Sequence, residues 1–158
     1  MRPPRYPLEP LAKLREDQVD TAVGGLAAAL ARRGAAERER RAAEQRQDAH
    51  EEAAAQVREA EHDALARGEL HAADLARAGA WEARVASERE ALAANVGRAL
   101  GGEAQARAAE RTSQEEVAAR QAAAEVVAAD RARWDEALRK KAETKEDEAA
   151  EEAFRPRR

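Results

Sequence analysis

The sequence predicts an all-α fold, a long two-helix antiparallel coiled-coil hairpin with a longer C-terminal helix. Alanine supplies 45 of the 158 residues and 38% of the residues are charged, which is typical of long helices and coiled coils. Four of the five prolines fall within the first ten residues and the fifth is Pro156, so 145 residues run without a helix breaker. Within that run, Gly68 and Asp74 mark a place where one helix is expected to end and another to begin.

The apolar residues are too small to fill a compact core. Only 24 of them are larger than alanine, among them eleven leucines and eight valines. Because burying one such side chain contributes only about 1.5–3 kcal/mol, this set is better suited to a narrow seam between two helices. High charge and low bulk are also compatible with intrinsic disorder. The abundance of alanine, arginine, glutamate and leucine, the strongest helix formers, favours the helical interpretation.

The first helix is expected to follow a Pro-rich N-terminal arm. We place the arm at residues 1–10 and the helix at about 11–66. Pro10 is compatible with the first turn, where its missing N–H costs nothing. The helix is expected to close at Arg67-Gly68, where the glycine can adopt the left-handed cap.

The second helix is expected at about 75–153, after a turn across 67–73 and with Asp74 as its N-cap. A C-terminal tail at 154–158 follows. Because the second helix is longer, its part beyond about Asp130 is expected to lack a partner from the first helix. It is expected to project as a largely single helix, either alone or accompanied by the Pro-rich arm.

Apolar residues at alternating spacings of three and four predict the seam. In the first helix, the predicted positions are Leu11, Leu14, Val19, Val23, Leu26 and Leu30, followed by Ala35, Ala42 and Ala49. In the second helix, they are Ala78, Trp81, Val85, Leu92, Val96, Val117, Ala124, Val127, Trp134 and Leu138. Alanine seams let helices approach closely but bury little area, so we expect a marginally stable hairpin that depends on partners.

Glycines interrupt both predicted helices, as Gly24-Gly25 in the first and as Gly97, Gly101 and Gly102 in the second. Each costs about 1 kcal/mol relative to alanine inside a helix. One interpretation is a close-packed or slightly kinked spot in a continuous hairpin. The other is a flexible joint, or a third helix that restarts at Ser113, where Ser-Gln-Glu-Glu has the form of a capping box.

The sequence lacks residues arranged for catalysis. It has no cysteine and no glycine-rich phosphate loop, and His50, His62 and His71 do not have the spacing of a zinc helix. Neighbouring carboxylates on a solvated helix have nothing to raise their pKa for acid–base work. We therefore expect no enzyme activity, no cofactor and no metal site.

Charge and hydropathy also exclude some partners. The net charge is −4, which gives no basic field to attract nucleic acid. No stretch approaches 18 uninterrupted apolar residues and the first residues do not resemble a signal peptide, so direct membrane insertion is not expected. The absence of cysteine is consistent with a cytoplasmic protein. Three of the four lysines, Lys140, Lys141 and Lys145, lie near the end of the second helix, while Lys13 lies near the start of the first.

Three segments of the sequence carry ordered motifs around the expected turn near residue 70. The first is Pro7-Leu8-x-x-Leu11-x-x-Leu14-Arg15-Glu16, followed by Val19, Ala22 and Leu26. The second is Asp74-Leu75-x-x-Ala78-x-x-Trp81-x-x-x-Val85, and the third is Trp134-x-x-Ala137 followed by Lys145-Glu146-Asp147-Glu148-x-Ala150. In this order and spacing, the segments resemble the FliJ/YscO family of coiled-coil stalk proteins in flagellar and type III secretion export machines. Ala78 replaces the usual first aromatic residue of the family's second segment.

This resemblance implies a central stalk that links a hexameric secretion ATPase to a membrane export-gate protein, with export chaperones as further partners. It implies a cytoplasmic location at the periphery of the membrane export apparatus. The open end would contact the ATPase through Leu11, Leu14, Arg15, Trp134, Arg139, Lys140, Lys141 and Lys145. The hairpin end would contact the export gate through Leu75, Trp81 and Val85. The alternative is a coiled-coil scaffold or peripheral-stalk protein that acts as a dimeric tether.

Overall fold

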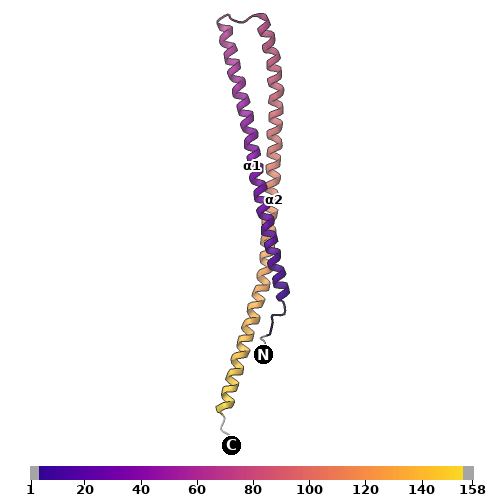
Figure 1. The fold of residues 1–158 in the computed structure, drawn as a ribbon, viewed down its shortest axis with the longest axis vertical. Helices are drawn as coiled ribbons and strands as arrows, with labels where there is room; N and C mark the ends of the chain where they lie inside the picture. Colours follow the sequence, from indigo (N-terminus) through magenta and orange to yellow (C-terminus); the bar gives the residue numbers. More distant parts are fainter. Residues whose placement is uncertain (1–3, 155–158) are drawn as a thin grey trace. The chain divides into compact units, whose positions relative to one another are not determined.

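The computed structural model describes residues 4–154 and contains two long helices that pack against each other (Figure 1). Helix α1 spans Glu9–Ala66 and helix α2 spans Ala72–Phe154, with 58 and 83 residues. Helices take up 93% of the described residues, which include no strand. The predicted all-α hairpin with a longer second helix is therefore confirmed. Residues 1–3 of the predicted arm and 155–158 of the predicted tail lie outside the described residues.

The chain divides into two units. The tip unit is the continuous stretch Ala28–Arg111, and the end unit combines the residues up to Ala27 with those from Thr112 onward. In the tip unit, Arg33 pairs with Glu110 and Arg58 with Glu82, so the two helices run antiparallel. In the end unit the pairing is also antiparallel, because Glu9 pairs with Arg131 whereas a groove further along α1 is lined by Val19 and Ala124.

Helix α1 begins two residues before the predicted start. The carbonyl of Leu8 accepts a hydrogen bond from the N–H of Ala12 at 2.9 Å, and the N–H of Glu9 donates to the carbonyl of Tyr6 at 3.3 Å. Pro10 therefore lies in the first turn, where the absence of an N–H leaves no helical hydrogen bond unmade. The glutamate at the first position also complements the positive end of the helix dipole.

Helix α1 ends in a Schellman turn. The N–H of Gly68 donates to the carbonyl of Leu65 at 3.0 Å, and the N–H of Glu69 donates to the carbonyl of Ala64 at 3.0 Å. Gly68 has a φ of 69°, a conformation that glycine adopts without steric cost. These bonds satisfy carbonyls that the end of a helix would leave unpaired, so the sequence ends α1 sharply at Ala66.

Helix α2 begins three residues before the predicted start, and Asp74 is not its N-cap. The carbonyl of His71 accepts hydrogen bonds from the N–H groups of Asp74 and Leu75, so His71 occupies the capping position. The Asp74 carboxylate instead accepts a hydrogen bond from the N–H of His71 at 2.9 Å. An acidic side chain three residues into a helix reaches back in this way in a capping box, and this is why an Asp that resembles a cap lies inside the helix.

The α2 side of the seam follows the predicted positions. Val85 and Val127 are buried, and the other eight predicted residues are half-buried. Between Val96 and Val117 the spacing of seven residues continues through Glu103 and Glu110, which are only 4% and 8% exposed. The seam of α2 therefore includes two carboxylates that the apolar pattern does not reveal.

The α1 side of the seam consists mainly of alanine. The buried residues of α1 are Ala22, Ala29, Ala43 and Ala54, whereas the predicted seam residues Leu14, Val23 and Leu30 are exposed. The predicted residues Leu11, Val19, Leu26 and Ala42 are half-buried, whereas Ala35 and Ala49 are exposed, so the predicted alanine row is wrong at these two positions. Small side chains let the helix axes approach closely, and the larger ones are displaced to the border of the seam.

Both helices are continuous through their glycines. Helix α1 passes through Gly24 and Gly25, and α2 passes through Gly101 and Gly102, without a break. The alternative of a third helix that restarts at Ser113 is therefore wrong. A Cβ added at any of these four glycines would meet no atom within 4 Å, so close packing does not require glycine there.

Candidate functional site

Tyr6 fixes the segment before α1 onto α2. Tyr6 is 6% exposed, and its hydroxyl donates a hydrogen bond to Oδ2 of Asp130 at 2.6 Å. The Tyr6 and Trp134 rings meet edge to face, with their centroids 5.6 Å apart. The Arg131 guanidinium lies 5.9 Å from the centre of the Tyr6 ring and pairs with Glu9 at 3.2 Å.

These contacts raise the pKa of Tyr6 to about 12. The hydrogen bond to Asp130 is the largest cause, followed by burial, because both favour the protonated hydroxyl. Sequence reasoning did not select Tyr6, because one aromatic residue in a Pro-rich arm carries no periodic signal.

The unpartnered part of α2 begins later than predicted. Tyr6 and Glu9 pair with Asp130 and Arg131, and Leu138 is still half-buried. The described part of the Pro-rich arm accompanies α2 beyond Asp130, because Tyr6 contacts Trp134 and Pro4 lines a groove together with Leu138. From Arg139 to Phe154, which we call the overhang, every residue is exposed.

A groove lined by apolar and by charged side chains lies at the start of the overhang. Its volume is about 770 Å³. Pro4, Leu138 and Ala142 supply the apolar surface, and the charged or polar lining residues are Arg139, Lys140, Lys141, Thr144, Lys145 and Glu148. Of the lysines, Lys140 pairs with Glu136 at 2.8 Å. An apolar strip between cations can hold an amphipathic segment that carries negative charge.

The predicted ATPase contacts on α1 do not all lie on the surface. Leu14 is 51% exposed, whereas Leu11 and Arg15 are half-buried. Arg15 donates a hydrogen bond to the side-chain oxygen of Gln18 at 2.9 Å. On α2, Trp134 is half-buried against Tyr6, so its ring contributes to the packing of the end unit.

The predicted gate contacts lie in the tip unit and differ in exposure. Leu75 is 52% exposed and faces a groove of about 270 Å³, which is also lined by Leu65, itself 54% exposed. Trp81 is half-buried and Val85 is 4% exposed. Leu65 and Leu75 are therefore the accessible large apolar residues of this groove, while Val85 belongs to the seam.

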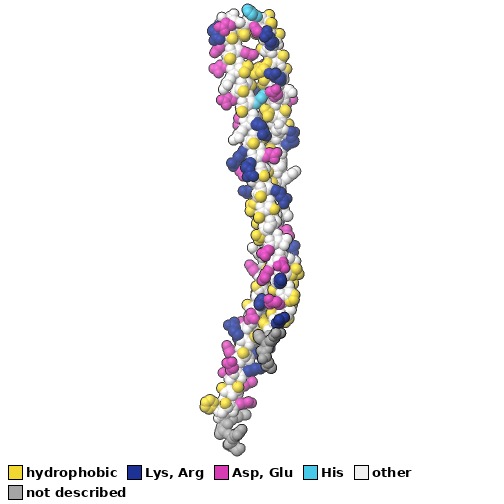
Figure 2. Space-filling view, viewed as in Figure 1, with side chains coloured by type: hydrophobic (Ala, Val, Ile, Leu, Met, Phe, Trp, Pro, Cys, Tyr) yellow, Lys and Arg dark blue, Asp and Glu magenta, His cyan; other side chains and the backbone are white. Residues whose placement is uncertain are grey.

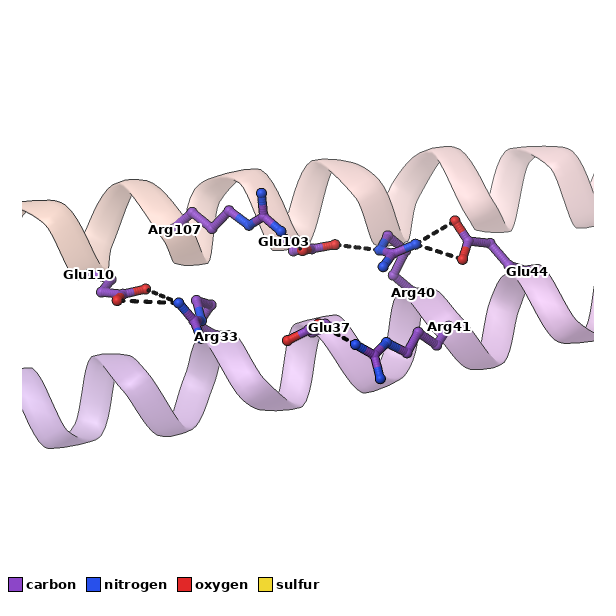
Figure 3. A network of polar contacts seen from close by, with 8 residues as sticks. All are labelled: Arg33, Glu37, Arg40, Arg41, Glu44, Glu103, Arg107 and Glu110. Atoms are coloured by element: carbon purple, nitrogen blue, oxygen red, sulfur yellow. Dashed lines mark hydrogen bonds and ion pairs between the residues drawn. The ribbon is translucent and has the colours of Figure 1, made fainter.

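Two ionic layers cross the seam of the tip unit (Figure 3). Oε2 of Glu103 accepts a hydrogen bond from Nε of Arg40 at 2.6 Å, and its Oε1 lies 2.5 Å from Nη2 of Arg107. Arg40 also donates to both carboxylate oxygens of Glu44, at 2.7 and 2.6 Å. The sequence signal was available, because Arg40 and Glu103 lie on the seven-residue spacing of their helices, but their charge suggested a solvated face.

The second ionic layer joins Arg33 and Glu110, whose nearest atoms are 3.2 Å apart. Glu110 has a side chain that is 10% exposed, whereas that of Arg33 is 43% exposed. Together, Arg33 and Arg40 of α1 face two carboxylates of α2 that are seven residues apart. Buried charges of opposite sign in consecutive layers favour one register of the two helices over others.

Burial would by itself raise the pKa of Glu103. The hydrogen bond from Arg40 and the charges of Arg107 and Arg40 outweigh this effect, so the pKa of Glu103 lies below its ordinary value. Closer to the tip, the hydrogen bond from Arg89 lowers the pKa of Glu51. These carboxylates therefore remain ionised at neutral pH and act as structural ion pairs.

The histidines do not cluster. His50 is half-buried, and its Nε2 lies 3.0 Å from Glu88, whereas His62 and His71 are exposed. Within residues 4–154, no group of three or more His, Cys, Asp or Glu side chains is placed to hold a metal ion. Acidic and basic side chains are interspersed on the face drawn in Figure 2. None of the helices in the described part of the chain is long and apolar enough to cross a membrane.

Comparisons with protein-family models, with curated proteins and with solved structures find no match for this chain.

Proposed function

We propose that this protein is the central stalk of a type III export machine, of either the flagellar or the injectisome type. In this role it links a hexameric secretion ATPase to a membrane export-gate protein through protein–protein contacts, with export chaperones as further partners. It acts in the cytoplasm at the periphery of the export apparatus. The resemblance of three sequence segments to the FliJ/YscO family suggested this role.

The single observation that best supports the proposal is the exposed overhang. Arg139, Lys140, Lys141 and Lys145 lie on a part of α2 whose residues are all exposed. They line a groove together with the apolar residues Pro4, Leu138 and Ala142. A helix without intramolecular packing gains no stability from the rest of the fold, so its sequence is free to serve a partner. Cations on such a helix can orient it in a pore lined by carboxylates.

The decisive experiment reverses Arg139, Lys140 and Lys141 to glutamate in the full chain. We expect this variant to melt like the wild type but to lose binding to the purified hexameric ATPase and stimulation of its hydrolysis. Wild-type binding should weaken as the salt concentration rises, because exposed charges are screened.

A matched control reverses three exposed arginines of the tip unit, Arg32, Arg77 and Arg84, which changes the net charge by the same amount. The control should bind the ATPase like the wild type. If the overhang variant binds and stimulates the ATPase normally, the overhang is a solvated helix and the proposed orientation of the stalk is wrong.

The contact with the export gate is tested at the tip. Replacing exposed Leu75 with alanine should weaken binding to the gate protein with little loss of thermal stability, because Leu75 is 52% exposed. Trp81→Ala should weaken both binding and stability, since its ring is half-buried. Equal affinity of wild type and Leu75→Ala for the gate protein would exclude this residue from the contact.

A further inference from the structure

The overhang presents one helix face with the spacing of a coiled-coil seam. Leu138, Ala142, Lys145 and Ala149 follow one another at intervals of four, three and four residues, so they lie on one side of α2. Leu138, Ala142 and Lys145 all line the same groove. Alanines comparable to Ala142 and Ala149 form the α1 side of the seam in both units, at Ala22 and Ala43.

Charge is divided into two consecutive blocks along the same helix. The basic block, residues 139–145, contains four cations and one glutamate. The acidic block, residues 146–152, contains five carboxylates and no cation. The net charge therefore changes from +3 to −5 across the boundary between residues 145 and 146.

This order of charges distinguishes two ways of pairing two such helices. In a parallel pair, the basic block would lie beside a basic block and the acidic block beside an acidic block. In an antiparallel pair centred near residues 145 and 146, each basic block lies beside the acidic block of the other helix. The sequence is thus complementary to itself in the antiparallel orientation, as a two-fold interface requires.

The hairpin uses the same type of contact within one chain. Its antiparallel helices place Arg40 opposite Glu103 and Arg89 opposite Glu51, with the nearest atoms 2.6 and 2.5 Å apart. An alanine-lined seam flanked by cross-helix ion pairs is therefore an arrangement that this chain already forms.

We propose that a second copy of this chain occupies the face of the overhang, and that the two overhangs pair antiparallel about a two-fold axis near residues 145 and 146. The inference goes beyond the proposed function and does not depend on it, because self-association is measured without an ATPase. The paired state covers Lys145 and places Arg139 and Lys141 at its borders, so it competes with any other acidic partner for these side chains.

The size of the surface sets the strength of the contact. From Leu138 to Phe154 the helix has 17 residues and a length of about 25 Å. An interface of this length belongs to the small, transient class, and exposed ion pairs contribute only modestly each. The association is therefore weak, reversible and sensitive to salt.

Two charge-reversed variants of the full chain test the proposal. The first carries Arg139→Glu, Lys141→Glu and Lys145→Glu, and the second carries Glu146→Lys, Glu148→Lys and Glu152→Lys, so every reversed residue lies on or beside the seam face. Sedimentation equilibrium in low salt, over about 10 μM to 1 mM, measures the dimerisation of each. Wild type should form a concentration-dependent dimer, and each variant alone should dimerise at least about tenfold more weakly.

An equimolar mixture of the two variants provides the sharpest readout. One variant then has an acidic overhang and the other a basic one, so the mixture should form a heterodimer at least as tight as the wild-type dimer. A chain that carries all six substitutions exchanges the signs of the residues and should recover self-association. This recovery separates charge pairing from any loss of helix in a single variant.

A matched control again reverses Arg32, Arg77 and Arg84 in the tip unit and should dimerise like the wild type. A wild-type chain that stays monomeric up to about 1 mM overturns the proposal. So does a mixture that stays monomeric, or a dimer that persists in both single variants, because the association would then use another surface.

Discussion

Glu103 and Arg40 form a hydrogen-bonded ion pair between the two helices of the tip unit, 2.6 Å apart and at a seam position where coiled coils usually place an apolar side chain. Glu103 is 4% exposed, so its charge depends on Arg40 and Arg107 for the interactions that water would otherwise supply. The seam of this unit is thus stabilised by charge and by alanine together.

This pair predicts a loss of stability in acid. The pKa of Glu103 is lower in the folded chain than its ordinary value of 4.5, so its contribution is present above about pH 4.5 and is lost as the pH falls through the folded pKa. Glu103→Gln should lower the melting temperature at pH 7 by about 5 °C or more and should flatten its decline in acid. Circular dichroism at pH 2.5–7 measures both effects. Glu143→Gln, in the exposed overhang, is the control, and equal acid slopes for Glu103→Gln and wild type would contradict the assignment.

The raised pKa of Tyr6 predicts a loss of stability at alkaline pH. Its pKa is raised to about 12, so the hydroxyl stays protonated in the folded chain while it would ionise near 10 in the unfolded chain. Stability contributed by Tyr6 is present below about pH 10 and is lost as the pH rises through 12. The chain contains a single tyrosine, so its ultraviolet absorbance titration reports this residue directly.

The matched variant for this titration is Asp130→Asn, which removes the charge that holds the Tyr6 proton. We expect its titration midpoint to move towards 10. A wild-type midpoint near 10 in the folded protein would show that the contact between Tyr6 and Asp130 does not form in solution.

The phase of the alanine seam predicts a contrast between two similar substitutions. Ala43 is 2% exposed, so Ala43→Leu overfills the seam and should lower the free energy of unfolding by about 1–3 kcal/mol. Ala49 is exposed, so Ala49→Leu should change it by at most about 0.5 kcal/mol. Chemical denaturation measures both. If Ala49→Leu lowers the free energy of unfolding more than Ala43→Leu does, the seam includes Ala49 and not Ala43.

Replacing a glycine with alanine is predicted to raise stability inside a helix and to lower it at the turn. A Cβ at Gly101 meets nothing within 4 Å, so Gly101→Ala should raise the free energy of unfolding by about 1 kcal/mol. Gly68→Ala should lower it by about 1–2 kcal/mol, because Gly68 has a φ of 69°. Thermal or chemical denaturation of both variants measures this difference in sign. A loss of stability in Gly101→Ala would indicate that α2 is not helical at this point in solution.

The large-scale features of the fold could be predicted from the sequence because they depend on local signals. The proline-free run predicts long helices, and Gly68 supplies the left-handed residue that ends the first of them. On α2, valines and tryptophans are rare enough that their spacing identifies the seam, and Val85 and Val127 are both buried.

The α1 side of the seam could not be predicted in the same way. Alanine occurs on every face of this helix, so apolar spacing does not distinguish Ala43 from Ala49. Arg40 and Glu103 lie at positions that face the other helix. A charged residue is usually solvated, so the sequence of one helix alone does not show which charges are paired in the seam. The contact between Tyr6 and Asp130 joins residues 124 positions apart, and nothing in either local sequence indicates it.

The way in which the sequence is divided between the two units affects the order in which the chain folds. The tip unit is a single continuous stretch closed by the Schellman turn, whereas the end unit requires two stretches that are separated by the whole tip unit. The entropy lost on closing a loop increases with its length, so pairing that starts at the turn adds each further layer at little entropic cost. The two helices should therefore pair progressively, starting next to Gly68 and ending at Tyr6 and Trp134. The contacts of Tyr6 with Trp134 and Asp130 therefore form last, and they are the first to open when the hairpin is strained.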